Sequence, residues 1–399
     1  MDPVLSLVIH DILPTEILEM IFEEHAILEW EAPTIDGRVC RLWRQIVLNT
    51  PRAWAHIEIR NDSVLSMGQV RLRLHRSSTA PLHINARKAG RDACQKLYDL
   101  FSDHHTRIAS LQMRFGSPSF FEGRDFPCMR LLYVGCWYPA RWGSMPKLQS
   151  LRLCAPNWCM VPLSELPPLK MLALSGVKCT PVLWHSQSLT KLMLLSVSLV
   201  HAISSPLNFP SLTYLSLYGV RGLNPHVNAP RLVAYHEDGY MADESFNVSL
   251  PSLVEYGVYN PNASNLDPTK LQLSFPNARR LAIRADGPVL LSFFISLANQ
   301  PHLLPALQTI STGRKCLGTF EIAEGVQENI RSLVLRRNEA CHGNAVVCFE
   351  TGASPQIPIF FGAVSDLYIK RSCALLMRLL DSGSWLLKTP RPQVLACSL

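Results

Sequence analysis

The sequence lacks the motifs that mark most catalytic sites. It has no phosphate-binding glycine loop, no G-x-S-x-G nucleophile turn and no H-E-x-x-H zinc motif. Asp103, His104 and His105 could supply metal ligands, but adjacent side chains on a helix diverge and no third ligand is evident. A surface position or a helix end is the better interpretation of these three residues. We therefore predict that the chain is not an enzyme and binds no metal or cofactor.

Long apolar runs are also missing. No segment stays apolar for the roughly 18 residues that a bilayer span requires. The longest run, VLLSFFISLA at 289–298, ends at 299–301 with Asn-Gln-Pro and is typical of a buried element. The first residues carry Asp2 where a secretory signal has positive charge. We expect no signal peptide, no membrane partner, and a location in the cytoplasm, the nucleus or both.

Cysteine is sparse and unclustered. The 12 cysteines are spread from Cys40 to Cys397 without a C-x-x-C pair, and the closest spacings are those of Cys154 with Cys159 and of Cys341 with Cys348. This pattern fits neither a disulfide framework nor a zinc finger. Cysteines in such a setting usually act as small apolar core residues, and a reducing intracellular compartment fits them.

Charge is low and mildly basic. Charged residues make up 17% of the chain and the net charge is +7. The densest arginine groups are Arg71, Arg73 and Arg76; Arg279, Arg280 and Arg284; and Arg331, Arg336 and Arg337. None is a continuous basic run like that of a nucleic-acid-binding arm. Solvated surface charge is favoured over a nucleic-acid site, which remains an alternative hypothesis.

What the chain does contain is a repeat with the template apolar-Pro-x-L-x-x-L-x-L. The matches are RIASLQM (107–113, without the proline), FPCMRLLYV (126–134), MPKLQSLRL (145–153), LPPLKMLAL (166–174), SLTKLML (188–194), FPSLTYLSL (209–217), APRLVAYHE (229–237), LPSLVEYGV (250–258), FPNARRLAI (275–283), LPALQTIST (304–312) and NIRSLVL (329–335). Their first leucine-type positions recur at a period of about 21 residues. Leucine-rich repeats have this period and this L-x-x-L-x-L core.

Each match predicts a short strand with two buried side chains. The leucines of L-x-L lie on one face because side chains alternate along a strand. One coil cannot bury that stripe alone, whereas stacked coils bury it against each other. The proline favours extended geometry just before each strand. We expect a solenoid with a curved parallel sheet.

The repeat is irregular in several places. Tyr235 and Glu237 stand where inward leucines belong. The segment 289–298 predicts a helix inside the longest repeat. Towards the end, 363–369 could form one more turn, and 373–383 reads as a helix that ends at a glycine.

Ahead of the repeats, two short segments have the periodicity of amphipathic helices. The first stripe consists of Ile17, Leu18, Ile21 and Phe22, and the second consists of Val39, Leu42, Trp43, Ile46 and Val47. Pro14 suits the start of the first helix and Pro51 ends the second. Two short helices cannot hide this much apolar surface between themselves. Either the repeats or another protein must cover it.

This stretch resembles the F-box, and in particular the F-box proteins with leucine-rich repeats that are abundant in mushroom-forming fungi. The matching residues are Leu13, Pro14, Glu16, Ile17, Leu18, Ile21, Phe22, Val39, Cys40 and Trp43, followed by TPRAWAHIEI (50–59) and VRLRLHRSSTAPLHI (70–84). The resemblance implies an α/β fold: a small N-terminal helical F-box followed by an irregular leucine-rich-repeat solenoid. The expected parts are an F-box at 10–59, a helical linker and cap at 60–106, the solenoid at 107–338, and irregular last turns with a C-terminal cap at 339–399.

The resemblance also implies a function. F-box proteins are non-catalytic substrate adaptors of SCF-type (Skp–cullin–F-box) ubiquitin ligases: the F-box binds the Skp adaptor and, through it, the cullin. By correspondence, the residues expected to bind the adaptor are Leu13, Pro14, Ile17, Leu18, Ile21, Phe22, Val39, Cys40 and Trp43. The alternative is that these side chains simply pack on the first repeats of a ligase-independent scaffold.

A protein substrate would bind the concave face of the sheet. Residues beside the buried leucines face that side, and tyrosine and arginine are frequent among interface hot spots. The candidates are Tyr133, Arg152, Met193, Tyr214, Tyr218, Tyr259, Arg280, Arg284 and Arg336.

Overall fold

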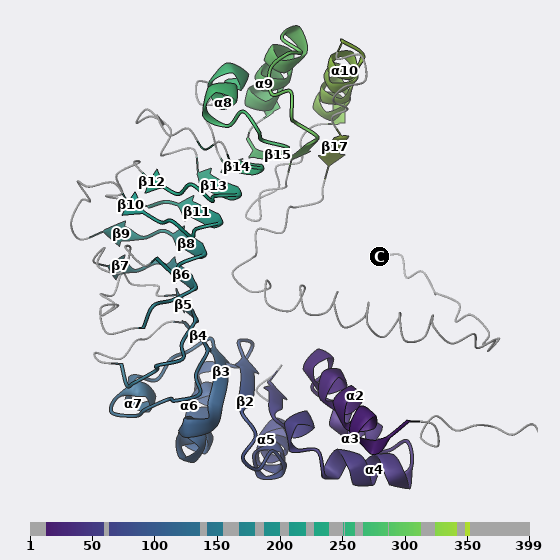
Figure 1. The fold of residues 1–399 in the computed structure, drawn as a ribbon, viewed down its shortest axis with the longest axis vertical. Coiled ribbons are helices and arrows are strands. Elements are labelled where there is room, and N and C mark those ends of the chain that lie inside the picture. The colour runs from purple at the N-terminus through teal and green to yellow at the C-terminus, as the bar shows by residue number, and fades with distance from the viewer. Residues whose placement is uncertain are drawn as a thin grey trace, which may run out of the picture. The chain divides into compact units, whose positions relative to one another are not determined.

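The structure of the chain is a computed structural model (Figure 1). It describes residues 13–59, 64–135, 142–154, 167–179, 187–199, 207–220, 227–238, 250, 252–259, 266–285, 287–312, 324–340 and 348–351. The chain divides into two units, Met1–Pro355 and Gln356–Leu399. The strand expected at 363–369 and the helix expected at 373–383 lie outside the described residues.

A single parallel sheet is the main element of the first unit. Its order is β1-β2-β3-β4-β5-β6-β8-β11-β13-β14-β15-β16-β17. The strands are β1 (His56–Glu58), β2 (Leu82–Ala86), β3 (Ile108–Met113), β4 (Leu131–Gly135), β5 (Ser150–Cys154), β6 (Met171–Ser175), β8 (Lys191–Leu195), β11 (Tyr214–Tyr218), β13 (Ala234–Asp238), β14 (Glu255–Tyr259), β15 (Arg280–Arg284), β16 (Thr309–Thr312) and β17 (Cys348–Thr351). The chain is thus a mixed α/β protein built on a parallel-sheet solenoid.

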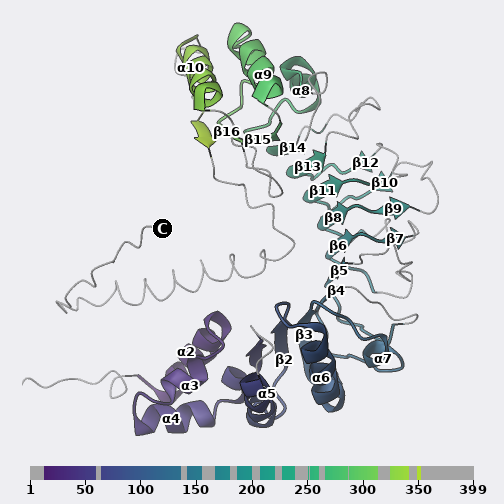
Figure 2. The ribbon, with the colours of Figure 1, turned by 180° about the vertical axis from the view of Figure 1, so that it is seen from behind.

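Shorter strands and helices accompany the sheet. Two strand pairs, β7 (Lys178–Cys179) with β9 (Ser198–Leu199) and β10 (Leu207–Asn208) with β12 (Val227–Asn228), run beside it and are visible from both sides (Figures 1 and 2). The helices are α2 (Thr15–Leu28), α3 (Ala32–Asp36), α4 (Arg41–Leu48), η1 (Pro51–Trp54), α5 (Val64–Arg76), α6 (Arg91–Phe101), η2 (Ser102–Arg107), α7 (Pro118–Phe121), α8 (Pro268–Ser274), α9 (Gly287–Asn299) and α10 (Glu324–Ala340). The helix predicted at 289–298 is confirmed as α9.

Ten of the eleven repeat matches form strands, from β3 to β16. The eleventh prediction, a strand at 329–335, is wrong because this segment lies within α10. Ile330 and Val334 are buried four residues apart, as on a helix, whereas Leu335 is 61% exposed. The i, i+3 spacing of the strand template also fits one helix face, and the segment lacks the proline that eight of the ten strand-forming repeats carry.

The sheet also begins earlier than the repeat spacing indicates. β1 and β2 pair in parallel ahead of β3. Both strands alternate buried and less buried residues: Ile57 is buried in β1, and Leu82 and Ile84 are buried in β2. Neither carries the full leucine template, so the period alone did not reveal them.

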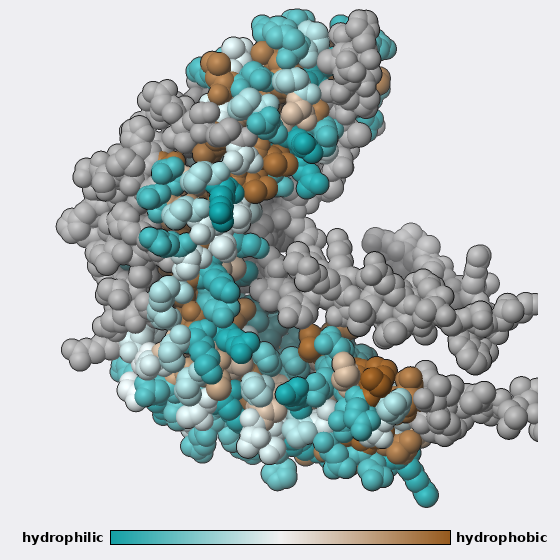
Figure 3. Space-filling view, in the orientation of Figure 1, coloured by the Kyte–Doolittle hydropathy of each residue, from teal (hydrophilic) through white to brown (hydrophobic). Residues whose placement is uncertain are grey.

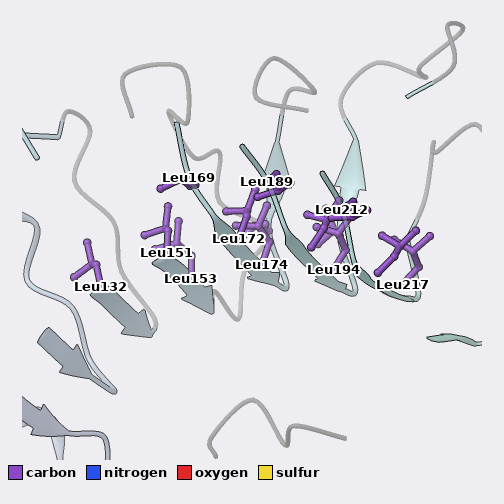
Figure 4. Close-up of a cluster of buried hydrophobic side chains, with 14 of the residues drawn as sticks. Leu132, Leu151, Leu153, Leu169, Leu172, Leu174, Leu189, Leu194, Leu212 and Leu217 are labelled. Atoms are coloured by element: carbon purple, nitrogen blue, oxygen red, sulfur yellow. The ribbon is translucent and has the colours of Figure 1, made fainter. Parts of the chain in front are cut away.

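The core is a ladder of side chains shared between neighbouring strands. The register places Leu151 beside Leu172 and Leu153 beside Leu174, and all four are at most 2% exposed. Figure 4 shows these leucines stacking from one strand to the next. Burying one leucine contributes about 1.5–3 kcal/mol. No single strand can collect this stabilisation without its neighbours.

The proline of the template has a specific structural role that its position alone did not reveal. The carbonyl of the apolar residue before the proline accepts a hydrogen bond from the N–H of the first leucine-type residue, as in Phe209 to Leu212 at 3.2 Å. The same bond closes the turns Phe126–Met129, Met145–Leu148, Ala229–Leu232, Leu250–Leu253, Phe275–Ala278 and Leu304–Leu307. This is a four-residue β-turn with proline at its second position, where the fixed φ of proline is favoured. The turn directs the chain into each strand.

The polar residues predicted to disturb the seventh repeat are accommodated in the core. Tyr235 and Glu237 are 1% and 2% exposed. The hydroxyls of Tyr235 and Tyr256 donate hydrogen bonds to the two carboxylate oxygens of Glu237, at 2.8 and 2.6 Å. Burial and the adjacent carboxylate raise the pKa of Tyr256 well above its ordinary value. A hydrogen-bonded group therefore replaces two leucines.

Gly257 provides space for a buried histidine. It pairs in register with His236, and a Cβ at position 257 would lie 2.3 Å from His236 Nδ1. We predict that Gly257→Ala lowers the free energy of unfolding by about 1–3 kcal/mol through overpacking. Urea unfolding will measure this, and His236→Ala combined with Gly257→Ala should lose less than the sum of the single losses. Strictly additive losses would contradict the proposed contact.

The stability of the sheet should depend on pH through His56. Its ring stacks on that of His83 with centroids 4.7 Å apart. Burial, His83 and Arg73 lower the pKa of His56 from 6.5 to about 3. Below pH 6.5 the unfolded chain therefore binds a proton that the folded chain does not, and the free energy of unfolding falls by up to about 1.4 kcal/mol per pH unit.

We predict that His56→Gln reduces this pH dependence. Urea unfolding at about pH 7.5 and about pH 5.5 will give the slope of the unfolding free energy with pH. The exposed His302 offers a matched control, and His302→Gln should keep the slope of the unmodified protein. An unchanged slope in His56→Gln would show that other groups cause the acid sensitivity.

Candidate functional site

Residues 13–54 form a helical module with a hydrophobic core of its own. α2, α3, α4 and η1 pack against one another. The core consists of Leu18, Phe22, Ala26, Ile46, Val47, Ala53 and Trp54, with Leu13, Ile21 and Trp43 packed at its margin. It is separate from the large core that the strands share. The apolar residues of the module therefore pack mainly on one another and not on the first repeats.

Local hydrogen bonds fix the ends of these short helices. The Cys40 sulfur, at the N-cap of α4, accepts a bond from the Trp43 backbone N–H at 3.4 Å. The indole N–H of Trp54 donates to the Val47 carbonyl at 2.8 Å, and the Thr50 hydroxyl donates to Ile46. Because Trp54 and Thr50 are buried, these bonds satisfy polar groups that would otherwise be costly inside the module.

A histidine–carboxylate contact joins α2 to α3. His25 Nδ1 lies 3.1 Å from both carboxylate oxygens of Asp36. Burial raises the pKa of Asp36, and the His25 contact opposes that rise. Arg44 Nε in turn donates to the Gly37 carbonyl at 2.8 Å, which ties the segment after α3 to α4. The three helices thus hold each other in place.

The nine residues predicted to bind an adaptor fall into three classes of exposure. Leu18 and Phe22 are buried, at 2% and 1%, inside the module. Leu13, Ile21, Cys40 and Trp43 are partly buried, and Trp43 meets Phe22 edge to face with ring centroids 5.0 Å apart. Pro14, Ile17 and Val39 are exposed. All nine come together in one module, but only part of the set is accessible to a partner.

An exposed apolar surface covers the same helices. Of the 13 large apolar residues that are exposed in the described part of the chain, eight lie between positions 17 and 48. They are Ile17, Met20, Ile27, Leu28, Ile35, Val39, Leu42 and Leu48. We call these eight residues the apolar surface. In the space-filling view, brown side chains gather over the region of α2 (Figure 3).

α2 is apolar on two opposite sides. Leu18, Phe22 and Ala26 point into the module core at i, i+4 spacing, while Ile17 and Met20 belong to an exposed stripe. A surface helix normally carries polar residues on the side opposite its buried stripe, and α2 departs from this with an exposed apolar stripe. The sequence carried this signal in Met20, Ile27 and Leu28, which lie outside the motif-based set and were missed.

The helical module continues into the sheet without a linker. Trp54 belongs to the module core, and the next residue, Ala55, belongs to the core of the sheet. Arg73 of α5 is 3% exposed and lies over the rings of Trp30 and Trp54, at 4.8 and 5.5 Å. It also donates a hydrogen bond to the His56 carbonyl at 3.2 Å. This arginine therefore touches both parts.

The predicted substrate residues do not form one open surface. The register places Tyr133, Arg152 and Met193 in one row on the face of the sheet opposite the core. We call this face the non-core face. The three side chains are only 4–6% exposed. Large side chains in one row stand about 4.8 Å apart and shield one another. These three residues therefore lie on the face expected to bind a substrate, but little of each side chain is accessible there.

The other candidates are dispersed. Tyr214 and Tyr218 are partly exposed at the two ends of β11, and Arg280 is exposed on β15. Arg336 lies on α10 rather than on a strand, for the reason given above for the eleventh repeat. The side chains of Tyr259 and Arg284 lie outside the described part of the structure.

A polar group missed by the sequence analysis occupies the same face. His236 is 4% exposed, and its Nε2 lies 3.2 Å from Glu255 Oε1. Arg280 approaches the other oxygen of Glu255 at 4.0 Å, and the Tyr214 ring lies 5.5 Å from that of His236. The hydrogen bond with His236 lowers the pKa of Glu255. This group therefore favours the charged form of the Glu255 carboxylate on the non-core face.

Within the described ranges, no three histidine, cysteine or acidic side chains lie close enough together to hold a metal ion. No helix in these ranges is both long and apolar enough to cross a membrane. Comparison with models of known protein families and with curated proteins found no match to this chain.

The two sides of α2 should respond differently to substitution. We predict that Phe22→Ala destabilises the helical module by about 3–5 kcal/mol because it leaves a cavity in its core. Ile17→Ser, on the exposed side, should change the free energy of unfolding by no more than about 0.5 kcal/mol. Thermal unfolding followed by circular dichroism will compare the two. Similar losses would mean that Ile17 is covered in solution.

Proposed function

We propose that this chain is the substrate-recognition subunit of an SCF-type ubiquitin ligase. In this proposal the helical module is an F-box that binds the Skp adaptor and, through it, a cullin. The sheet is a leucine-rich-repeat domain that binds a protein substrate. The chain itself performs no chemistry, and it acts in the cytoplasm, the nucleus or both.

The apolar surface is the observation that carries this proposal. The helical module buries Phe22 and Trp54 in its own core and still exposes eight large apolar side chains, seven on α2, α3 and α4 and one, Val39, between α3 and α4. Concentrated apolar surface on a soluble protein marks an interaction site. An adaptor that covered these side chains would gain about 25 cal/mol of binding free energy for each Å² of apolar area removed from water.

The arrangement of the chain supports the same interpretation. The sequence motif that resembles the F-box coincides with the helices that expose this surface, and Ile17 and Val39 are common to both. The module has a core of its own, so its exposed apolar residues are not buried against the first repeats. The interpretation in which the motif residues merely pack on the repeats has less support.

Adaptor binding should depend on the apolar surface and not on apolar residues elsewhere. We predict that Val39→Asp combined with Leu42→Asp weakens binding to a basidiomycete Skp adaptor at least ~30-fold, because the loss of even one buried interface anchor commonly costs about 2 kcal/mol. Binding will be measured by co-purification and by calorimetry with the full chain.

The matched control is Leu273→Asp combined with Leu335→Asp, which changes two leucines on α8 and α10 that are 75% and 61% exposed. This variant should bind the adaptor like the unmodified chain. If the unmodified, folded chain binds no Skp adaptor at all, the ligase interpretation fails and a ligase-independent scaffold remains.

A further inference from the structure

A row of cations follows the edge of the sheet at which its strands begin. In each repeat, two residues separate the first leucine-type position from the second. The first of these two positions is basic in three repeats, where it is Arg130, Lys170 and Arg279. The second position is basic in two repeats, where it is Lys191 and Arg280. All five side chains are exposed. We call these five residues the basic row.

Because the strands are parallel and in register, residues at these two repeat positions line up across the sheet. The row runs from β4 to β15, which is seven steps in the strand order. At about 4.8 Å per strand the row is about 34 Å long, and Arg130, Lys170 and Lys191 fall within about 14 Å at one end. Arg279 and Arg280 form the other end, at β15.

Four of the five cations of the row are not neutralised by the rest of the described chain. Arg130, Lys170, Lys191 and Arg279 form no ion pair with the residues that the structure describes. The other residues at the same two positions, from β4 to β16, are uncharged except Glu255. That carboxylate is already held by His236 and approached by Arg280.

The middle of the row is different in character. Between Lys191 and Arg280, β11 presents the partly exposed Tyr214, and Val233 before β13 is 44% exposed. A ligand that follows the row therefore meets positive charge, then an aromatic and an apolar side chain, and then positive charge again. Charge complementarity of this kind guides association and fixes register.

We propose that the basic row binds an extended acidic segment of a partner protein. About ten residues of extended chain, at about 3.3 Å each, match its length. Acidic side chains would face the two charged ends, and apolar side chains would lie on Tyr214 and Val233. Glu255 and Val233 would oppose a continuous phosphate backbone, so a peptide fits better than a nucleic acid. This proposal rests on the proposed function in one respect: the segment would belong to the ligase substrate.

The test uses the full chain and a fluorescein-labelled peptide of about ten residues, with Asp and Glu at both ends and Leu-Tyr in the middle. A second peptide replaces every Asp and Glu by Asn and Gln. Fluorescence polarisation will measure binding to the unmodified chain and to two double variants. Lys170→Glu with Lys191→Glu changes the row, and Lys96→Glu with Lys178→Glu changes two exposed lysines on α6 and β7.

The two variants lower the net charge equally, from +7 to +3. We expect the row variant to weaken binding of the acidic peptide at least ~10-fold, and the control variant by no more than ~2-fold. The neutral peptide should bind at least ~10-fold more weakly than the acidic one. Circular dichroism will check that both variants fold, as expected for substitutions at exposed positions.

Several results would overturn this inference. These are no binding of the acidic peptide, equal losses in the row and control variants, or equal binding of the neutral peptide. A single-stranded DNA of matching length that binds more tightly than the peptide, and loses affinity in the row variant, would reassign the row to nucleic acid. The peptide assay contains no Skp adaptor, and the row variant should keep adaptor binding. Loss of peptide binding would therefore contradict the acidic-segment proposal alone, and loss of adaptor binding would contradict the ligase proposal alone.

Discussion

The strands of this protein cannot be stable one at a time. Each strand places two side chains on the core face, and only its neighbours cover them, as Leu172 does for Leu151. A residue at such a position must either be apolar or bring its own hydrogen-bond partners. Glu237 satisfies the second condition because Tyr235 and Tyr256 donate to both of its oxygens. The need for shared burial, rather than the identity of leucine, therefore determines which repeats the sheet accepts.

This requirement explains how far the fold could be predicted from the sequence. Ten strands followed from the period because burial recurs at the same two positions of each repeat. β1 and β2 were missed because their neighbours supply part of the burial, so the full leucine template is unnecessary there. The segment at 329–335 was assigned to the wrong element because Ile330 and Leu333 satisfy both a strand template and a helix face. Only the packing of α10 distinguishes the two.

The candidate site was predicted in its location but not in its detail. An excess of apolar residues in two short helices indicated that something must cover them. Whether a residue is buried or exposed depended on packing between helices, which no single helix reveals. Trp54 of η1 packs with Leu18 and Phe22 in the module core, whereas Ile17 and Val39 stay exposed. The exposure of the non-core face was equally hard to predict, because a large side chain such as Tyr133 shields its neighbours.

The apolar surface and the basic row differ in the physics by which they can hold a partner. Burial of apolar area gives affinity that depends little on salt, whereas exposed charges gain modest energy and are screened by salt. A long-lived contact with a constant partner suits the first, and a brief contact with changing partners suits the second. The consecutive residues Trp54 and Ala55, together with Arg73, join the two parts without a linker. A partner on the helices and a partner on the sheet would thus be held by one chain through two interactions that need not compete.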